Sequence, residues 1–271
     1  MTVTVGQRAW HLPKALLARH STFFAQLCRD PAQSAITLDD AVDAHAFANF
    51  ADYIHSSIYT LNPHVAAFRS IRANTHAYLL GCRLGAQSYS DAALRKLHRL
   101  FEPLAKLGCS NARLSSIRAA DVQVVWRATR PGDGLRCLFA DAVASHWRQL
   151  DVVRVGADAD GLETVSWREV YDMFGDLRER LVASLAWADG ERGGLLGRVE
   201  GYLDRRGSGM GVLRRRQEGG RVMGGAQSGE GWDDEGIGRW RERVKNGRDG
   251  GDEESLRADV KDEWMVVDKD D

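Results

Sequence analysis

The pattern of apolar and polar positions predicts a β-hairpin at the start of the chain and a helix directly after it. Residues 2–5 alternate polar and apolar side chains, and Gly6 follows them as a turn residue. Residues 8–12 can form the returning strand of the hairpin. Pro13 suits the first turn of a helix, because an amide at that position has no partner within the helix. Apolar residues then recur at helical spacing through the run KALLARHSTFFAQLC, which predicts one helix over residues 14–28.

A third strand and a second helix are predicted from the next segment. Residues 34–38, with the sequence SAITL, form a short run that contains β-branched side chains. Asp39, Asp40 and Asp43 follow as N-terminal caps, since short acidic side chains accept hydrogen bonds from the free amides of a first turn. Apolar residues at helical spacing give this helix one buried stripe: Ala46, Phe47, Phe50, Tyr53, Ile54 and Ile58.

Helical periodicity continues along the rest of the chain as far as residue 187. A helix is predicted over residues 62–84 and is interrupted by Gly85. Ser90 is expected to cap the run DAALRKLHRLFEPL, and residues 165–187 are expected to form a last helix that packs on the folded part. The predicted fold class is therefore α+β, with three short strands and a helical majority.

Charge and glycine divide the chain unevenly. Residues 1–150 carry 17 Lys and Arg against 10 Asp and Glu, which leaves 20 and 28 of the totals of 37 and 38 for the rest. Nineteen of the 28 glycines come after Ala188. A glycine-rich, charged segment loses much chain entropy on ordering and buries little apolar surface. We therefore expect residues 189–271 to be a disordered tail.

The sequence contains no pattern typical of a catalytic, cofactor or metal site. Four cysteines, Cys28, Cys82, Cys109 and Cys137, lie far apart without a CxxC pair, so we expect reduced, mostly buried thiols. The eight histidines form no HxxxH or HExxH group, and we expect them at the surface or half-buried. No P-loop or GxSxG element occurs. We therefore predict no enzymatic activity and no cofactor.

The expected location is the cytoplasm or the nucleus. No apolar stretch approaches the roughly 20 residues that span a bilayer, so no membrane association is expected. Met1 to Pro13 lacks the features of a secretory signal.

Two charged blocks near the end of the chain are candidate binding segments. Arginines at positions 205, 206, 214, 215, 216 and 221 have no aromatic stacking partners, so a solvated linker is favoured over a nuclear-import signal or nucleic-acid contacts. Residues 249–271 are acidic and contain an apolar island at residues 264–267. Both an inert tail and a segment that orders on a partner protein remain open interpretations.

Four motifs in order resemble the BTB/POZ domain, in the divergent form abundant in filamentous fungi. They read VTVG, then WHLPKALLARHSTFF, then ITLDDAVDAHAFANFADYIHSSIYT, then YLLGCRLGAQSYSDAALRKLH. The run VVWRATRPGDGLRCLFADAVASHW resembles the helical pair that often follows the domain, with Thr129, Leu135 and Arg136 in its signature places. The resemblance implies a BTB/POZ-like domain over residues 1–108 and a helical extension over residues 109–188.

The matching positions are expected to form the structural core of the BTB-like motif and not a ligand pocket, because apolar residues at helical spacing usually bury. These core positions are Leu16, Leu17, Ser21, Phe24, Leu38, Phe47, Phe50, Tyr59, Leu80, Gly81 and Leu84.

The resemblance implies a protein-protein interaction module that is not catalytic and that binds other proteins, including a second copy of itself. The alternative is a substrate adaptor of a cullin-type ubiquitin ligase. The chain begins almost on the VxVG strand, so the exchanged N-terminal segment of dimeric members is not expected. The region LCRDPAQS lacks the glutamate of a hydrophobic-x-Glu element, so cullin binding is expected to be weak.

Overall fold

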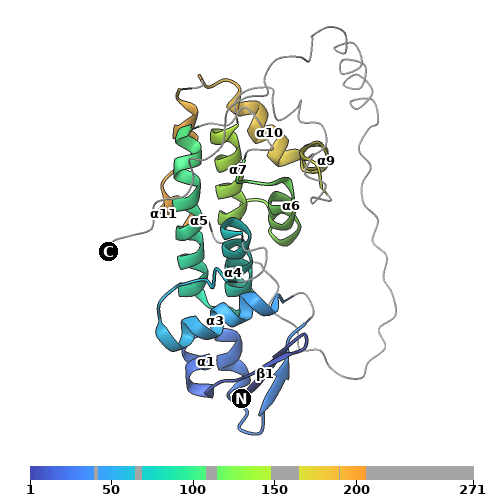
Figure 1. The fold of residues 1–271 in the computed structure, drawn as a ribbon, viewed down its shortest axis with the longest axis vertical. Coiled ribbons are helices and arrows are strands. Elements are labelled where there is room, and N and C mark those ends of the chain that lie inside the picture. The colour runs from blue at the N-terminus through green and yellow to red at the C-terminus, as the bar shows by residue number, and fades with distance from the viewer. Residues whose placement is uncertain (40–41, 65–68, 108–114, 148–164, 189, 206–271) are drawn as a thin grey trace. The chain divides into compact units, whose positions relative to one another are not determined.

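Three short strands and a majority of helices give the described residues the predicted α+β class (Figure 1). The computed structural model describes residues 1–39, 42–64, 69–107, 115–147, 165–188 and 190–205. All of these residues belong to one unit, Met1–Glu218.

The sheet has the strand order β2-β1-β3. The central strand β1 (Thr2–Val5) pairs antiparallel with β2 (Arg8–His11) and parallel with β3 (Ala35–Thr37). Val3 and Val5 are fully buried, whereas Thr2 and Thr4 are partly exposed. The predicted hairpin and the predicted third strand are therefore confirmed, and the alternation of β1 directs its valines into the core.

The helix predicted over residues 14–28 is in fact two helices, α1 (Lys14–His20) and α2 (Thr22–Leu27). Ser21 is extended between them. Its hydroxyl donates a 2.5 Å hydrogen bond to the carbonyl oxygen of Leu84 and accepts one from the amide of Phe24. The single-helix prediction was wrong because this side chain competes with the backbone for hydrogen bonds and caps a new helix.

Helix α3 (Ala44–Ser56) begins after Asp43, whose carboxylate accepts a 2.7 Å hydrogen bond from the amide of Ala46. Asp43 is therefore the capping residue, and Asp39 instead pairs with Arg83 at 3.8 Å. Asp40 lies outside the described residues.

The apolar stripe predicted for α3 is buried except at its end. Ser57 adopts a left-handed backbone with φ of 57° and ends the helix. Ile58 thereby leaves the helical stripe and is 65% exposed, so its predicted burial was wrong. The other five positions of the stripe, up to Ile54, are buried.

Helices α4 (Ser70–Leu84) and α5 (Gln87–Leu107) lie side by side (Figure 1). Gly85 separates them, as predicted, with φ of +60°, a conformation that glycine adopts without strain. The predicted boundaries were less accurate. Helix α4 does not begin at residue 62, and α5 begins before Ser90, whose hydroxyl donates to the carbonyl of Gln87 inside the helix.

The described residues between 115 and 188 form α6 (Ala119–Ala128), α7 (Gly134–His146), α9 (Trp167–Met173) and α10 (Gly175–Ser184). The single helix predicted over residues 165–187 was wrong, because the chain is extended at Phe174. This break brings the Phe174 ring to 6.0 Å from that of Trp126. A second helix, α10, therefore starts where the Phe174 side chain packs against Trp126 of α6.

The predicted start of the tail at residue 189 was also wrong for residues 190–205. This segment contains a short 3-10 helix, η2 (Arg192–Leu195), and α11 (Val199–Leu203), both in contact with α7. Leu195, Tyr202 and Leu203 are buried. Three buried side chains offset the entropy that the flanking glycines lose on ordering. Residues 206–271 lie outside the described residues, so their disorder stays a prediction.

Helix α11 approaches α7 closely. The hydroxyl of Tyr202 donates to the carboxylate of Asp141 at 2.9 Å and accepts the amide of Gly197 at 2.8 Å. Arg180 of α10 binds the same carboxylate at 2.7 Å. A Cβ atom on Gly134 would overlap the carbonyl oxygen of Tyr202, so glycine is required at the start of α7.

Candidate functional site

The core positions of the resemblance mostly lie inside the unit. Ser21 is 2% exposed, Gly81 is buried against Ser90, and Leu16 and Tyr59 are only partly buried. The hydroxyl of Tyr59 donates to Asn74 at 2.7 Å. The remaining positions are buried apolar side chains: Leu17, Phe24, Leu38, Phe47, Phe50, Leu80 and Leu84. Most of these residues hold the core together, and Leu80 also lines the pocket described next.

A pocket opens between the start of α3, the middle of α4 and the end of α6. Its volume is about 150 Å³. Six lining residues are apolar or small, and three are polar and come from α3 and α4. The lining consists of Val42, Asp43, Ala46, His76, Leu79, Leu80, Arg83, Val124 and Ala128. An apolar pocket with a few polar groups is the usual form of a binding site. We call it the α3–α4–α6 pocket.

The polar side chains of the pocket are His76, Asp43 and Arg83, and each has a distinct environment. Burial lowers the pKa of His76, and the positive charges of Arg72 and Arg83 lower it further, against the opposing effects of Asp43 and Asp121. His76 is therefore neutral at pH 7. The carboxylate of Asp43 caps α3, and Arg83 contacts Asp39.

A buried ion cluster joins α4 to α6 behind the pocket. The carboxylate of Asp121 is fully buried and accepts hydrogen bonds from Arg72 at 2.7 Å and Arg69 at 3.0 Å. Two arginines thus neutralise one buried carboxylate, which would be costly to bury alone. The cluster fixes the distance between the two helices that line the pocket.

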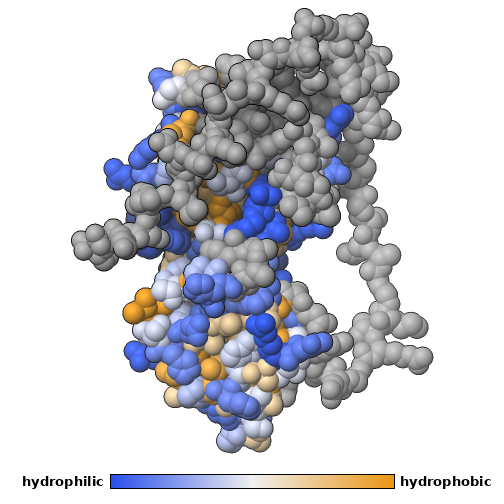
Figure 2. Space-filling model, viewed as in Figure 1, coloured by the Kyte–Doolittle hydropathy of each residue, from blue (hydrophilic) through white to orange (hydrophobic). Residues whose placement is uncertain are grey.

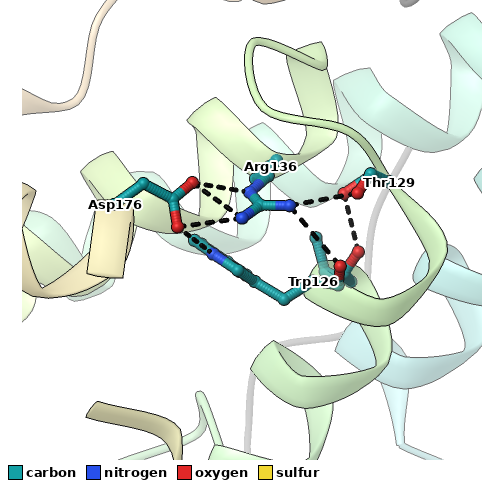
Figure 3. A network of polar contacts seen from close by, with 5 residues as sticks. Trp126, Thr129, Arg136 and Asp176 are labelled. Carbon is teal, nitrogen blue, oxygen red and sulfur yellow. Dashed lines mark hydrogen bonds and ion pairs between the residues drawn. The ribbon is translucent and has the colours of Figure 1, made fainter. Parts of the chain in front are cut away.

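A second polar cluster holds the extension together (Figure 3). The guanidinium of Arg136 lies between the carboxylate of Asp176, with two hydrogen bonds of 2.8 Å, and the carbonyl of Thr129 at 3.0 Å. The indole of Trp126 donates to Asp176 at 2.9 Å, and Arg136 stacks over its ring at 5.0 Å. Arg136 thus links the Thr129 carbonyl to the carboxylate of Asp176, which lies forty residues after Arg136 in the chain.

Hydrogen bonds decide the ionisation of Asp176. Burial alone would raise the pKa of its carboxyl group, but the hydrogen bonds from Arg136 and Trp126 outweigh burial and lower that pKa. Asp176 is therefore a carboxylate at neutral pH and ties α6, α7 and α10 together.

Ser115 and His146 form a hydrogen-bonded pair that no sequence motif indicated. Nε2 of His146 lies 3.1 Å from the hydroxyl oxygen of Ser115, and Nδ1 lies 2.9 Å from the carbonyl oxygen of Leu104. The carbonyl can only accept, so Nδ1 carries the proton and Nε2 accepts from Ser115. His146 is 4% exposed and Ser115 is 6% exposed, so the pair connects α7 to α5 and is closed to a substrate. The prediction that the histidines lie at the surface or half-buried was wrong for His146, which is buried.

The cysteines are free thiols at three described positions, Cys28, Cys82 and Cys137, and each is partly buried. Cys109 lies outside the described residues. Burial raises the pKa of Cys82 to about 12, so this thiol is protonated at neutral pH and is a poor nucleophile.

The pocket residues were not found from the sequence because no motif contains them. His76, Arg83 and Val124 come from two helices that are separated by α5 in the chain. In the view of Figure 2, hydrophilic residues cover most of the described surface, and hydrophobic ones form small separate areas. Burial of Val42 and Leu80 beside partly exposed Arg83 is a tertiary feature that periodicity alone does not show.

The described residues contain neither a metal-binding cluster nor a membrane-spanning helix. No group of three or more His, Cys, Asp or Glu is arranged to hold a metal ion in that part of the chain. Among the same residues, no helix combines the length and apolarity needed to cross a membrane. Comparison with known proteins found no protein-family model, no curated protein and no solved structure that matches this chain.

Proposed function

We propose that this chain is a protein-protein interaction module with a BTB/POZ-like domain and a helical extension. The observation that carries the proposal is the α3–α4–α6 pocket, which is lined by six apolar or small residues and three polar ones. A strand order of β2-β1-β3 followed by packed helices supports the BTB/POZ-like assignment, as does the burial of Phe24, Phe47 and Phe50 in one core.

The proposal assigns no catalytic role to the pocket. Among the described residues, its lining contains no Ser, Thr or Cys. The Asp43 carboxylate already accepts a hydrogen bond from the amide of Ala46, where it caps α3. Recognition of a partner surface requires only shape and charge, and the pocket offers both.

Direct binding tests the proposal. The full chain is used to capture proteins from its native cells, and each captured protein is purified and titrated against the chain. We expect at least one protein to bind directly with a defined stoichiometry. Sedimentation over a wide dilution series measures self-association in parallel. A chain that stays monomeric at every concentration and binds none of the captured proteins would contradict the proposal.

The cullin-adaptor alternative is separated by one further titration. A purified cullin N-terminal domain is added to the full chain, and we expect an affinity no tighter than micromolar, about −8 kcal/mol. Nanomolar binding would favour the adaptor role over a general interaction module.

A further inference from the structure

We propose that the α3–α4–α6 pocket binds the side chain of one tyrosine of a partner protein, with the tyrosine hydroxyl hydrogen-bonded to His76. This inference rests on the proposed function and specifies what the pocket recognises.

His76 has hydrogen-bonding capacity that the described residues do not use. Its side chain is half-buried and lines the pocket. Within the part of the chain that the structure describes, its ring nitrogens have no hydrogen-bond partner. A neutral imidazole has one N–H donor and one acceptor nitrogen, and covering either without a hydrogen bond is costly. An occupant that covers His76 must therefore offer it a hydrogen bond.

The size of the pocket selects a single ring. Pockets for drug-sized small molecules usually enclose about 300 to 1,000 Å³. The pocket here encloses about 150 Å³, a volume comparable to an apolar cavity that holds one benzene molecule. One six-membered ring therefore matches the space, whereas the fused rings of a tryptophan and a whole cofactor are larger.

The walls of the pocket suit the apolar body of that ring. Six of the nine lining residues are apolar or small, and they come from both sides of the pocket: Val42, Ala46, Leu79, Leu80, Val124 and Ala128. Burial of an aromatic ring against such walls is favourable, since it removes apolar surface from water.

The charges of the lining favour an uncharged occupant. Asp43 and Arg83 carry opposite charges, and His76 is neutral, so the lining has no net charge. Both charged groups are also engaged within the chain, because Asp43 accepts the amide of Ala46 and Arg83 contacts Asp39. A charged side chain would lose its hydration here without a matching gain.

Tyrosine combines these three properties. It has one six-membered ring, it is uncharged at pH 7, and its hydroxyl both donates and accepts hydrogen bonds. The hydroxyl therefore matches either neutral tautomer of His76. Phenylalanine suits the walls but leaves His76 without a partner, and serine or asparagine offers the hydrogen bond without the apolar ring.

NMR titration of the full chain with neutral tyrosine analogues tests the proposal. The probes are N-acetyl-tyrosine amide, the phenylalanine amide that lacks only the hydroxyl, and the alanine amide that lacks the ring. Methyl signals of the chain, including those of Leu79 and Val124, report binding. We expect a dissociation constant on the order of 1 mM for the tyrosine amide. The phenylalanine amide should bind about threefold or more weakly, and the alanine amide about tenfold or more weakly.

Two variants locate the binding site. His76→Phe keeps a ring and removes the hydrogen bond, so the tyrosine and phenylalanine amides should bind this variant equally. Ala128→Leu adds a side chain that occupies the pocket and should weaken both amides about tenfold or more. The matched controls are His55→Phe and Ala183→Leu, which make the same changes at exposed positions of α3 and α10, and these should bind like the original chain.

Thermal unfolding of each variant ensures that a loss of binding is not a loss of fold. Equal binding of the tyrosine and phenylalanine amides to the original chain would overturn the proposal. The same holds for no binding at about 10 mM, for a tyrosine preference that persists in His76→Phe, and for unchanged binding by Ala128→Leu. If the captured partner proteins also keep their full affinity for Ala128→Leu, the interaction module stands and only its assignment to this pocket fails.

Discussion

At the residue scale, aromatic side chains of α3 pack against Tyr89 of α5 in the core. Phe50 is fully buried, and its ring lies 5.3 Å from Tyr89 and 5.9 Å from Phe47. We predict that Phe50→Ala lowers the free energy of unfolding by about 3 to 5 kcal/mol, because it removes transfer energy and leaves a cavity. Chemical denaturation measures this change. Ile58→Ala is the control at an exposed position and should change stability by about 0.5 kcal/mol or less.

His146 should make stability depend on pH. Burial lowers its pKa below 6.5, although the hydrogen bond with Leu104 partly opposes this effect. Below pH 6.5 the unfolded chain therefore binds more protons than the folded chain, and the free energy of unfolding falls as the pH falls. We predict a smaller decrease for His146→Gln between about pH 7.5 and pH 5.5. Denaturation at several pH values measures both slopes, and parallel slopes would contradict the prediction. His20 and His76 also have lowered pKa values and should leave a residual slope.

At the scale of elements, the Asp176 carboxylate connects three helices. We predict that Asp176→Ala lowers the free energy of unfolding by about 1 to 3 kcal/mol, because Trp126 and Arg136 lose their acceptor while remaining largely buried. Asp172→Ala is the matched control on α9. Its contact with Arg168 is exposed and 4.0 Å long, so its loss should change stability by less than about 1 kcal/mol. Similar effects of both variants, measured by denaturation, would show that the cluster of Figure 3 does not stabilise the unit.

At the scale of the whole molecule, ordered packing continues past the change in glycine content as far as α11 among the described residues. We predict that a chain ending at Arg205 keeps the melting temperature of the full chain. A chain ending at Ala188 should melt roughly 10 °C lower or more, because it lacks buried Leu195, Tyr202 and Leu203. Calorimetry of the three chains measures the difference. Equal melting of the two shortened chains would return the boundary to residue 188.

The sequence by itself determined the features that depend on neighbouring residues. Alternation in residues 2–5 predicted β1, Gly85 predicted the interruption between α4 and α5, and the stripe containing Phe47 and Phe50 predicted the buried face of α3. Each of these follows from local backbone geometry or from the spacing of apolar residues. Local spacing therefore sufficed for the α+β class and for most of the core.

Only the tertiary structure decided the features that need residues distant in the chain. Ser21 starts a second helix because the Leu84 carbonyl lies within reach of its hydroxyl. Residues 190–205 pack on α7 because the Tyr202 hydroxyl binds the Asp141 carboxylate and the Tyr202 backbone lies against Gly134. The pocket exists because the charge of Asp121 holds α6 against α4. Helical periodicity shows which residues are buried but not which helix covers them, and the pairing of distant groups creates both the pocket and the packing of α11 on α7.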